Sequence, residues 1–252
     1  MTTTSKQAFV AGCIGVATFV AVWWTSVSFS LIDHRVLPSP LELLRRVLLL
    51  EWTSVGLHIW VSLQRVVLGG LVGGVCGLVM GVLIGWSAQL RMVLSLPLEL
   101  LRPIPPLAWI PLAIIWFGIG DASKVFVIGL GCFFVMLTNT EKGIRDFDPA
   151  LIRQGRSYGL QGFALMRRVI LPGIRPDLMV GASISTSLAF ASLVAAELLG
   201  ADTGLGYLIM RGRLDGDFTM VLIAISLIAI LAYVLDVMVR RLIVPHGEAY
   251  RS

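Results

Sequence analysis

The sequence is poor in charge, because only 14% of its 252 residues are Asp, Glu, Lys or Arg. Soluble globular domains usually carry about 25% charged residues. Hydrophobic residues, in contrast, make up 57% of the chain. This balance excludes an ordinary soluble domain and predicts that lipid surrounds most of the protein surface.

Residue clusters that mark catalytic or redox chemistry are also missing. Cys13, Cys76 and Cys132 lie in apolar runs without a CxxC pair, so they indicate small hydrophobic side chains rather than a disulfide framework. The histidines are scattered, and the sequence has neither HExxH nor paired carboxylates within an apolar run, which disfavours an intramembrane enzyme. A GxxxxGKS/T sequence is absent too, so the chain has no Walker loop for ATP.

Charge-free runs divide the chain into candidate membrane spans. A spanning helix needs about 20 mainly apolar residues, and helices are favoured because lipid offers no water to unpaired backbone groups. The alternating segments of barrel strands are not seen. The pattern predicts an all-α membrane protein with six transmembrane helices, built on six runs without Asp, Glu, Lys or Arg: 8–32, 66–90, 103–120, 125–140, 178–196 and 218–235.

Two of these runs, 8–32 and 125–140, differ in length from a typical span of about 20 residues. The first is too long for the apolar core of a signal peptide, and SFSLIDH offers no small-x-small cleavage site, so we expect a retained helix. The run 125–140 is short, but Lys124 can extend it by snorkelling to the membrane surface.

The distribution of Lys and Arg predicts the orientation. Six helices put both termini on one side of the membrane. The loop 141–177 is rich in basic residues, and Arg91 and Arg102, expected to flank one turn, fall on the same side. Segments 33–56 and 201–217, on the other side, are nearer to charge balance. We therefore expect the N- and C-termini and the loop 141–177 in the cytoplasm.

Three local patterns refine this picture. After the first span, Pro38 and Pro40 set the start of a short amphipathic helix at the outer interface. Trp60 and Arg65 then suit the headgroup region. Glycines at three- and four-residue spacing leave one face of the second span nearly bare, which permits close helix packing. They are Gly69, Gly70, Gly73, Gly74, Gly77, Gly81 and Gly85.

Prolines interrupt the third span. Pro103, Pro105, Pro106 and Pro111 cannot all lie in one regular helix. Broken backbone at membrane depth survives only where it is buried in protein or lines a cavity. Two interpretations stay open: a moving or substrate-lining element, and a kinked cytoplasmic beginning of the span.

The longest polar interruption is residues 150–176, which contain five arginines and no acidic residue. Pro149 can start a helix, Gly159 permits a sharp left-handed turn, and Pro172 stops a second helix. The pattern predicts a helix–turn–helix with a cationic face that projects from the membrane. Contact with anionic lipid would explain the charges but not the glycine and proline positions.

The spacing of Gly159, Val169, Leu171 and Pro172 resembles the EAA loop of inner-membrane permeases of binding-protein-dependent ABC importers. The segments LRPIPPLAWIPLAIIWFGIG, LVAAELLGADTGLGYLI and VPHGE are similar to the branch that imports nitrate, aliphatic sulfonates and taurine, and most of all to taurine permeases. The likeness runs from about His58 to the C-terminus. It implies a type I ABC importer (MetI-like) permease fold in a bacterial inner membrane.

The resemblance implies a division into a first helix with its outer segment (1–57), a permease core of five spans (58–243) and a cytoplasmic tail (244–252). It also implies a function: two copies form the pathway, two cytoplasmic ATPases bind the loops, and an outer binding protein delivers the solute. The solute would be small and anionic or zwitterionic, taurine or another aliphatic sulfonate, with nitrate, bicarbonate or a heterocyclic precursor as alternatives.

ATP and Mg would be bound by the partner ATPase, so no cofactor is expected in this chain, which would be a non-catalytic subunit. Besides these proteins we expect membrane lipid, and no nucleic acid, as a partner. A self-sufficient channel or secondary carrier stays open as a different class. In that class the basic loop would only determine the orientation of the chain in the membrane. The absence of a convincing internal repeat weakens the carrier alternative.

By this resemblance the ATPase-coupling surface comprises Arg153, Gln154, Gly155, Arg156, Tyr158, Gly159, Leu160, Phe163, Leu171 and Pro172. The family's loop typically starts with Glu-Ala-Ala, where this chain has Arg153, Gln154 and Gly155. The usual acidic contact is therefore absent or reversed, and we expect Arg153 to meet an acidic residue on its partner.

Polar residues near the apolar runs are the candidates for a pathway or gate: Arg102, Pro105, Asn139, Ser183, Ser187 and Glu197. Arg102 is the best-placed cation to face an anion, or else it caps the cytoplasmic mouth. Serines can simply bond back to backbone carbonyls. Glu197 is expected to pair with a neighbouring span or with backbone amides, the alternative being an interfacial carboxylate on the outer loop. Gly204 and Gly206 predict an outer re-entrant turn.

Overall fold

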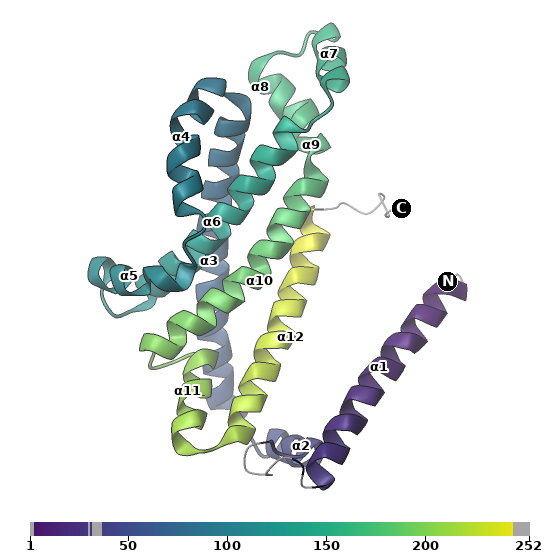
Figure 1. Ribbon diagram of the computed structural model, residues 1–252, viewed down its shortest axis with the longest axis vertical. Coiled ribbons are helices and arrows are strands. Elements are labelled where there is room, and N and C mark those ends of the chain that lie inside the picture. Colours follow the sequence, from purple (N-terminus) through teal and green to yellow (C-terminus); the bar gives the residue numbers. More distant parts are fainter. Residues whose placement is uncertain (1–2, 30, 32–36, 244–252) are drawn as a thin grey trace.

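The computed structural model describes residues 3–29, 31 and 37–243, and all regular structure in these ranges is helical (Figure 1). The tail 244–252, with its VPHGE segment, lies outside the described residues. The helices are α1 Thr3–Ser28, α2 Pro40–Leu48, α3 Trp52–Trp86, α4 Ala88–Leu101, η1 Pro106–Trp109, α5 Ile110–Phe117, α6 Asp121–Arg145, α7 Pro149–Ser157, α8 Gly162–Leu165, η2 Met166–Ile170, α9 Leu171–Gly173, α10 Arg175–Gly200, α11 Leu205–Asp215 and α12 Phe218–Ile243.

Within the described ranges, five helices are long and apolar enough to cross a membrane: α1, α3, α6, α10 and α12. A sixth candidate is a pair of shorter helical segments, Ala88–Leu101 and Pro106–Phe117, which meet at an angle of 89°. The prediction of six spans is met when this bent pair is counted as one. The expected bounds of the third span, 103–120, were wrong. The first arm of the bent pair begins at Ala88, and it includes the charged residues Arg91 and Glu99.

The prolines explain the bend. Pro103 and Pro105 lie in the break, where no N–H donor is needed, while Pro106 and Pro111 occupy the first turns of η1 and α5. Arg102 lies at the break, at the C-cap of α4, whereas Arg91 lies near the beginning of the same helix. The two arginines therefore do not flank one turn, which corrects the expected topology of this region.

The centre of the bundle is formed by α3, α6 and α10, which make the most extensive helix contacts. The predicted bare face of α3 packs on α6: a Cβ at Gly73 would overlap the Gly129 backbone, and one at Gly81 would lie 2.7 Å from the Cβ of Thr140. The glycines thus allow the two backbones to approach closely. Val66, Ile128 and Phe190 belong to the apolar core that fills the space between these three helices.

Two helices lie at the edge of this arrangement. α1 stands apart from the bundle in Figure 1, and only 6% of its spanning window is buried. The predicted amphipathic helix is present as α2, and Ser39 caps it: the Glu42 N–H donates to the Ser39 hydroxyl at 3.2 Å. An ion pair of 3.1 Å between Arg46 and Asp217 ties α2 to the beginning of α12.

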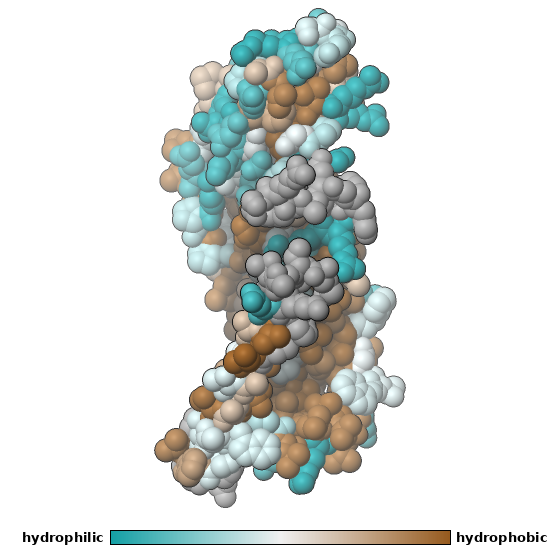
Figure 2. All heavy atoms as spheres, turned by 90° about the vertical axis from the view of Figure 1, so that its right-hand side faces the viewer, coloured by the Kyte–Doolittle hydropathy of each residue, from teal (hydrophilic) through white to brown (hydrophobic). Residues whose placement is uncertain are grey.

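The molecule is elongated, with α7 and α8 at one end and α2 and α11 toward the other (Figure 1). α3 has 35 residues, which corresponds to about 52 Å, so it is longer than the hydrocarbon core of a bilayer at about 30 Å. On the face shown in Figure 2, hydrophilic residues gather toward the end that carries α7 and α8. This end therefore extends beyond the apolar part of the bundle.

Candidate functional site

One end of the bundle carries a helical hairpin formed by residues 146–174, which we call the loop hairpin. α7 begins at Pro149, after the Asp148 carboxylate accepts a hydrogen bond of 2.7 Å from the Ala150 N–H. It ends in a Schellman motif, in which the Leu160 N–H donates to the Gly155 carbonyl at 3.1 Å. Gly159 has φ of +79°, in the left-handed region that favours glycine. The predicted turn at this glycine is confirmed.

Pro172, which the sequence predicts as the end of the second helix, does not stop it. Residues Met166–Ile170 form one π-helical turn, closed by a hydrogen bond from the Leu171 N–H to the Met166 carbonyl. Pro172 then lies in the first turn of α9, where a missing N–H costs little. The second arm of the loop hairpin therefore continues into α10 with only a short irregularity at Ile174.

The loop hairpin has an apolar core of its own. Leu165, Met166 and Ile170 are buried against Ile144 at the end of α6, with Leu160 and Leu171 packed beside them. Gly155 faces this core, and a Cβ there would lie 2.7 Å from the Cδ1 of Leu165. Glycine at this position therefore lets α7 pack directly on the second arm. The orientation of the loop hairpin is consequently fixed by packing.

The outward face of the loop hairpin combines cations with large aromatic rings. Tyr158 and Phe163 are each 77% exposed. Arg153, Gln154 and Arg156 on α7 are exposed as well. No ion pair involves Arg153 or Arg156 within the residues that the structure describes. This face, called the hairpin face below, thus offers uncompensated positive charge and apolar contact area together.

The ten residues expected at the coupling surface therefore separate into two groups. Arg153, Gln154, Arg156, Tyr158, Gly159, Phe163 and Pro172 are exposed, whereas Gly155 is buried and Leu160 and Leu171 are half-buried. The exposed residues can contact a partner, and the other three pack against the apolar core of the loop hairpin.

A second polar site lies away from the loop hairpin, around the last turns of α10. Glu197 is fully buried there, and its Oε1 accepts hydrogen bonds from Arg65 Nη1 at 2.7 Å and from the Ser62 hydroxyl at 2.8 Å. Its Oε2 accepts one of 2.7 Å from the Gly206 N–H. The predicted pairing with a neighbouring span and a backbone amide is confirmed, and the alternative of an interfacial carboxylate was wrong.

Arg65 is the centre of this site, although the sequence predicts it in the headgroup region. Its side chain is only 6% exposed. Its Nε donates to the Asp121 carboxylate at 2.8 Å, and its Nη1 also donates to the Thr203 carbonyl at 2.7 Å. One guanidinium therefore joins α3 to the beginning of α6, the end of α10 and the turn before α11. We call this set the Arg65 network.

The predicted turn at Gly204 and Gly206 closes the Arg65 network. Gly204 has φ of +126°, and a Cβ on it would overlap the Glu197 carboxylate, while one on Gly206 would lie 2.7 Å from the Glu197 Cβ. His58 accepts a hydrogen bond of 3.0 Å from the Gly204 N–H. The glycines thus make room for a buried carboxylate. Lys124, expected to snorkel, is instead buried and donates to the Gly120 carbonyl at 3.0 Å.

Sequence reasoning missed Arg65, Ser62 and Asp121 as members of a site. A signal was present, because Arg65 precedes one charge-free run and Glu197 follows another. Opposite charges at the ends of two apolar runs are natural partners once the helices lie side by side. The sequence does not show which runs are neighbours.

The other pathway candidates do not converge on one point. Arg102 and Pro105 are exposed at the break between α4 and η1. Asn139 is half-buried at the contact of α6 with α10, where its Nδ2 donates to the Val135 carbonyl at 2.9 Å. Ser183 donates to Asp236 on α12 at 2.6 Å, and Ser187 is exposed one turn further along α10. Their roles in a pathway stay predictions.

Among the residues that the structure describes, no group of three or more His, Cys, Asp or Glu side chains could hold a metal ion. The two polar sites differ in their chemistry, because the arginines of the hairpin face are exposed whereas Arg65 is buried. The hairpin face can bind a partner with acidic groups, and the Arg65 network can hold several helix ends in a fixed relation.

Comparisons with known proteins agree with this geometry. The family model described as binding-protein-dependent transport system inner membrane component matches residues 73–243. The taurine transport system permease protein TauC of Escherichia coli K12 is 34% identical over 245 residues, which cover 92% of this chain and 88% of that protein. The putative aliphatic sulfonates transport permease protein SsuC of the same strain is 38% identical over 86% of this chain and 83% of its own length.

A more distant relative is the nitrate import permease protein NrtB of Synechococcus elongatus, 31% identical over 73% of this chain and 67% of that protein. Among solved structures, an inward-facing MetNI methionine ABC transporter has a chain that is 25% identical, with a TM-score of 0.66. The match covers 77% of this chain and 95% of that one.

Proposed function

The chain belongs to the family of binding-protein-dependent transport system inner membrane components and is the permease of an ABC importer, and from this premise we propose that two copies form the pathway for a small sulfonate. Taurine or another aliphatic sulfonate is the proposed solute, because permeases for taurine and for aliphatic sulfonates are 34% and 38% identical to it over most of the chain. Nitrate is the alternative, supported by the weaker match to a nitrate permease.

The hairpin face is the proposed docking surface for a cytoplasmic ATPase, one on each copy. Exposed Tyr158 and Phe163 supply apolar anchors of the kind that dominate protein interfaces. Arg153 and Arg156 supply the charge, so the partner's groove should be acidic at the facing positions. The ATPases would bind ATP and Mg, while this chain carries out no covalent chemistry.

This assignment also fixes the proposed orientation. With the hairpin face in the cytoplasm, both termini lie on the cytoplasmic side, in agreement with the excess of Lys and Arg in the loop 141–177. The opposite end, with α2 and α11, then faces the binding protein. Because the second arm of the loop hairpin continues into α10, movement of a docked ATPase would be transmitted directly to that span.

The proposed path passes near the break of the third span. Arg102 is exposed at that break and forms no ion pair with the described residues, so it can attract an anion before the solute crosses. The Arg65 network is the proposed rigid element near the outer end. It would keep α10 and α11 together while the remainder of the bundle changes shape.

The observation that carries the proposal is the hairpin face, with exposed aromatic rings and uncompensated arginines held in place by a packed core. The test is uptake of labelled taurine into vesicles that contain the permease together with its ATPase and its binding protein. Uptake is expected only when ATP and all three proteins are present. Uptake by the permease alone would favour the channel or carrier class, and ATP-dependent uptake of nitrate without taurine would favour the alternative solute.

A further inference from the structure

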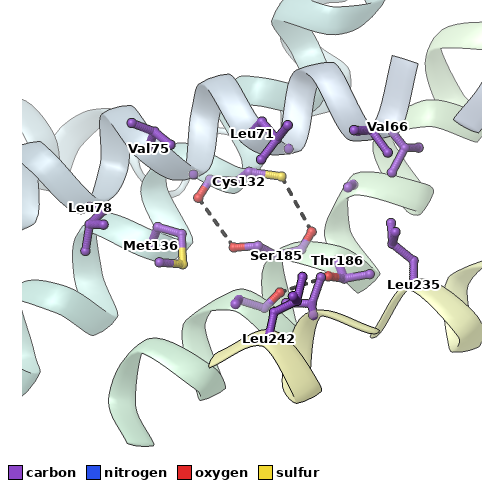
Figure 3. A pocket seen from close by; sticks show the side chains of 16 residues that line it. Val66, Leu71, Val75, Leu78, Cys132, Met136, Ser185, Thr186, Leu235 and Leu242 are labelled. Carbon is purple, nitrogen blue, oxygen red and sulfur yellow. Dashed lines mark hydrogen bonds between the residues drawn. The ribbon is translucent and has the colours of Figure 1, made fainter. Parts of the chain in front are cut away.

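A deep apolar groove runs along the side of the bundle between α3 and α12, with α6 and α10 forming its floor (Figure 3). Its volume is about 390 Å³. Val66, Leu71 and Val75 line it from α3, and Leu235 and Leu242 face them from α12. Gly70 and Gly74 belong to the same wall and leave it without side chains there. The groove is not part of the hairpin face or of the Arg65 network.

The polar atoms at the floor are already satisfied by the protein. The Ser185 hydroxyl donates to the Cys132 carbonyl, and the Cys132 thiol donates to the Ser185 carbonyl, both at 3.5 Å. The Thr186 hydroxyl donates to the Ala182 carbonyl at 3.0 Å. A groove whose few polar groups are paired offers nothing to a polar solute, so its occupant must be apolar over this length.

Basic residues follow one end of the groove in the sequence of α12. Val239 and Leu242 line it, and Arg240 and Arg241 lie between them in the sequence. The Arg240 guanidinium is held by Asp236 at 2.8 Å and by the Ser183 hydroxyl at 2.6 Å, next to the lining residue Ala182. Arg241 is exposed and forms no ion pair within the described part of the chain. Because Asp236 compensates Arg240, the free positive charge nearest to this end of the groove is that of Arg241, which directly precedes the lining residue Leu242.

We propose that this groove binds an anionic phospholipid, with an acyl chain between α3 and α12 and the phosphate beside Arg241. Basic groups next to pockets between membrane helices are suited to acidic lipid headgroups. The chain's own α1 does not fill the groove, because it stands apart from the bundle (Figure 1). The competing occupant is α1 of a second copy.

A groove-filling variant tests the acyl-chain part. A Cβ at Gly70 meets nothing within 4 Å, and Gly70 lines the groove, so the side chain of Gly70→Leu should extend into the groove space. Gly56→Leu is the matched control, because it lies on the same helix with equal free space and outside the groove. The full-length chain, purified in detergent with added phosphatidylglycerol, is compared by native mass spectrometry. Gly70→Leu should lose most of the retained lipid and Gly56→Leu should keep it. Equal retention by both variants would overturn the proposal.

A charge variant tests the headgroup part. Arg241→Gln should reduce phosphatidylglycerol retention about fivefold and leave phosphatidylcholine unchanged, since one basic residue contributes about that factor toward an anionic lipid surface. Arg168→Gln, exposed on the loop hairpin, is the control for net charge. Equal retention of the two lipids by the unmodified chain would show that any acyl chain suffices and would contradict the proposed anionic selectivity.

Cross-linking separates lipid from protein as the occupant. In a chain whose three cysteines are replaced by alanine, cysteines are placed at Gly70 and at Phe19, which is exposed on α1. No disulfide between two copies is expected in vesicles, because lipid occupies the groove. Efficient formation of that disulfide would assign the groove to α1 of a second copy and refute the proposal.

Discussion

The loop hairpin and the Arg65 network both depend on arginine, but they use it in opposite ways. At the hairpin face, Arg153 and Arg156 are exposed and have no ion pair in the described residues. In the network, Arg65 is buried and shares its guanidinium between Glu197 and Asp121. Charge that is left uncompensated is available to another protein, whereas charge that is buried and paired holds one chain in shape. Burial and pairing, rather than residue type, separate the two functions.

The largest expected effect concerns the buried side of this comparison. Arg65→Ala leaves the Glu197 carboxylate buried without its cation, which should destabilise the fold by about 3–5 kcal/mol. Thermal unfolding of the purified chain in detergent measures the loss. The double variant Arg65→Ala with Glu197→Gln should recover part of it, because no buried charge is then left alone. A single variant as stable as the unmodified chain would contradict the role assigned to the network.

A backbone substitution at the turn of the loop hairpin should have the next largest effect. Gly159→Val places a β-branched residue at φ of +79°, which costs about 1–3 kcal/mol. We expect uptake to be uncoupled from ATP hydrolysis in reconstituted vesicles, because the hairpin face would change shape. Gly216→Val is the matched control, with φ of +71° and equally free space, near the beginning of α12. It should cost similar stability but leave coupling intact, and equal uncoupling by both would remove the special role of the hairpin.

A smaller effect is expected where α7 packs on the second arm. Gly155→Ala puts a Cβ 2.7 Å from the Cδ1 of Leu165, and such overpacking costs about 1–3 kcal/mol. The gain of about 1 kcal/mol in helix propensity offsets part of that cost. We expect a net loss near 1 kcal/mol by these opposing effects, measurable as a lower midpoint of thermal unfolding. A rise in the midpoint would mean that Leu165 simply rotates away.

The smallest effect should come from the exposed ion pair between α2 and α12. Arg46 and Asp217 are both partly exposed, and pairs of this kind contribute about 0–1 kcal/mol. Arg46→Ala should therefore leave thermal stability nearly unchanged, in contrast to Arg65→Ala. A loss as large as that of Arg65→Ala would show that exposure does not distinguish the two arginines.

Much of the architecture could be predicted from the sequence, because it depends on local patterns. Charge-free runs locate the spans, Pro40 marks the beginning of α2, and Gly159 marks the turn of the loop hairpin. The first arm of the third span was missed because Arg91 and Glu99 interrupt the apolar run. Because of the bend, this arm is a separate amphipathic helix. A search for runs without any charged residue therefore does not detect it.

The Arg65 network could be predicted only in part. Glu197 was recognised by its cost at membrane depth, but its partner Arg65 lies 132 residues earlier in the chain. Only the packing of α3 against α6 and α10 brings the two charges together. Pro172 shows that a local signal can also mislead. The sequence predicts that it ends the helix, but it follows a π-helical turn, which the sequence does not reveal.

The central claim, that the hairpin face is exposed for a partner rather than for stability, is tested most directly by Arg153→Glu. The measurement is ATP hydrolysis by the reconstituted importer, with and without loaded binding protein, next to the thermal midpoint of the purified variant. The account predicts a several-fold loss of stimulated hydrolysis and an unchanged midpoint, because Arg153 is exposed and has no ion pair in the described part of the chain. Full stimulation by the charge-reversed variant would contradict it.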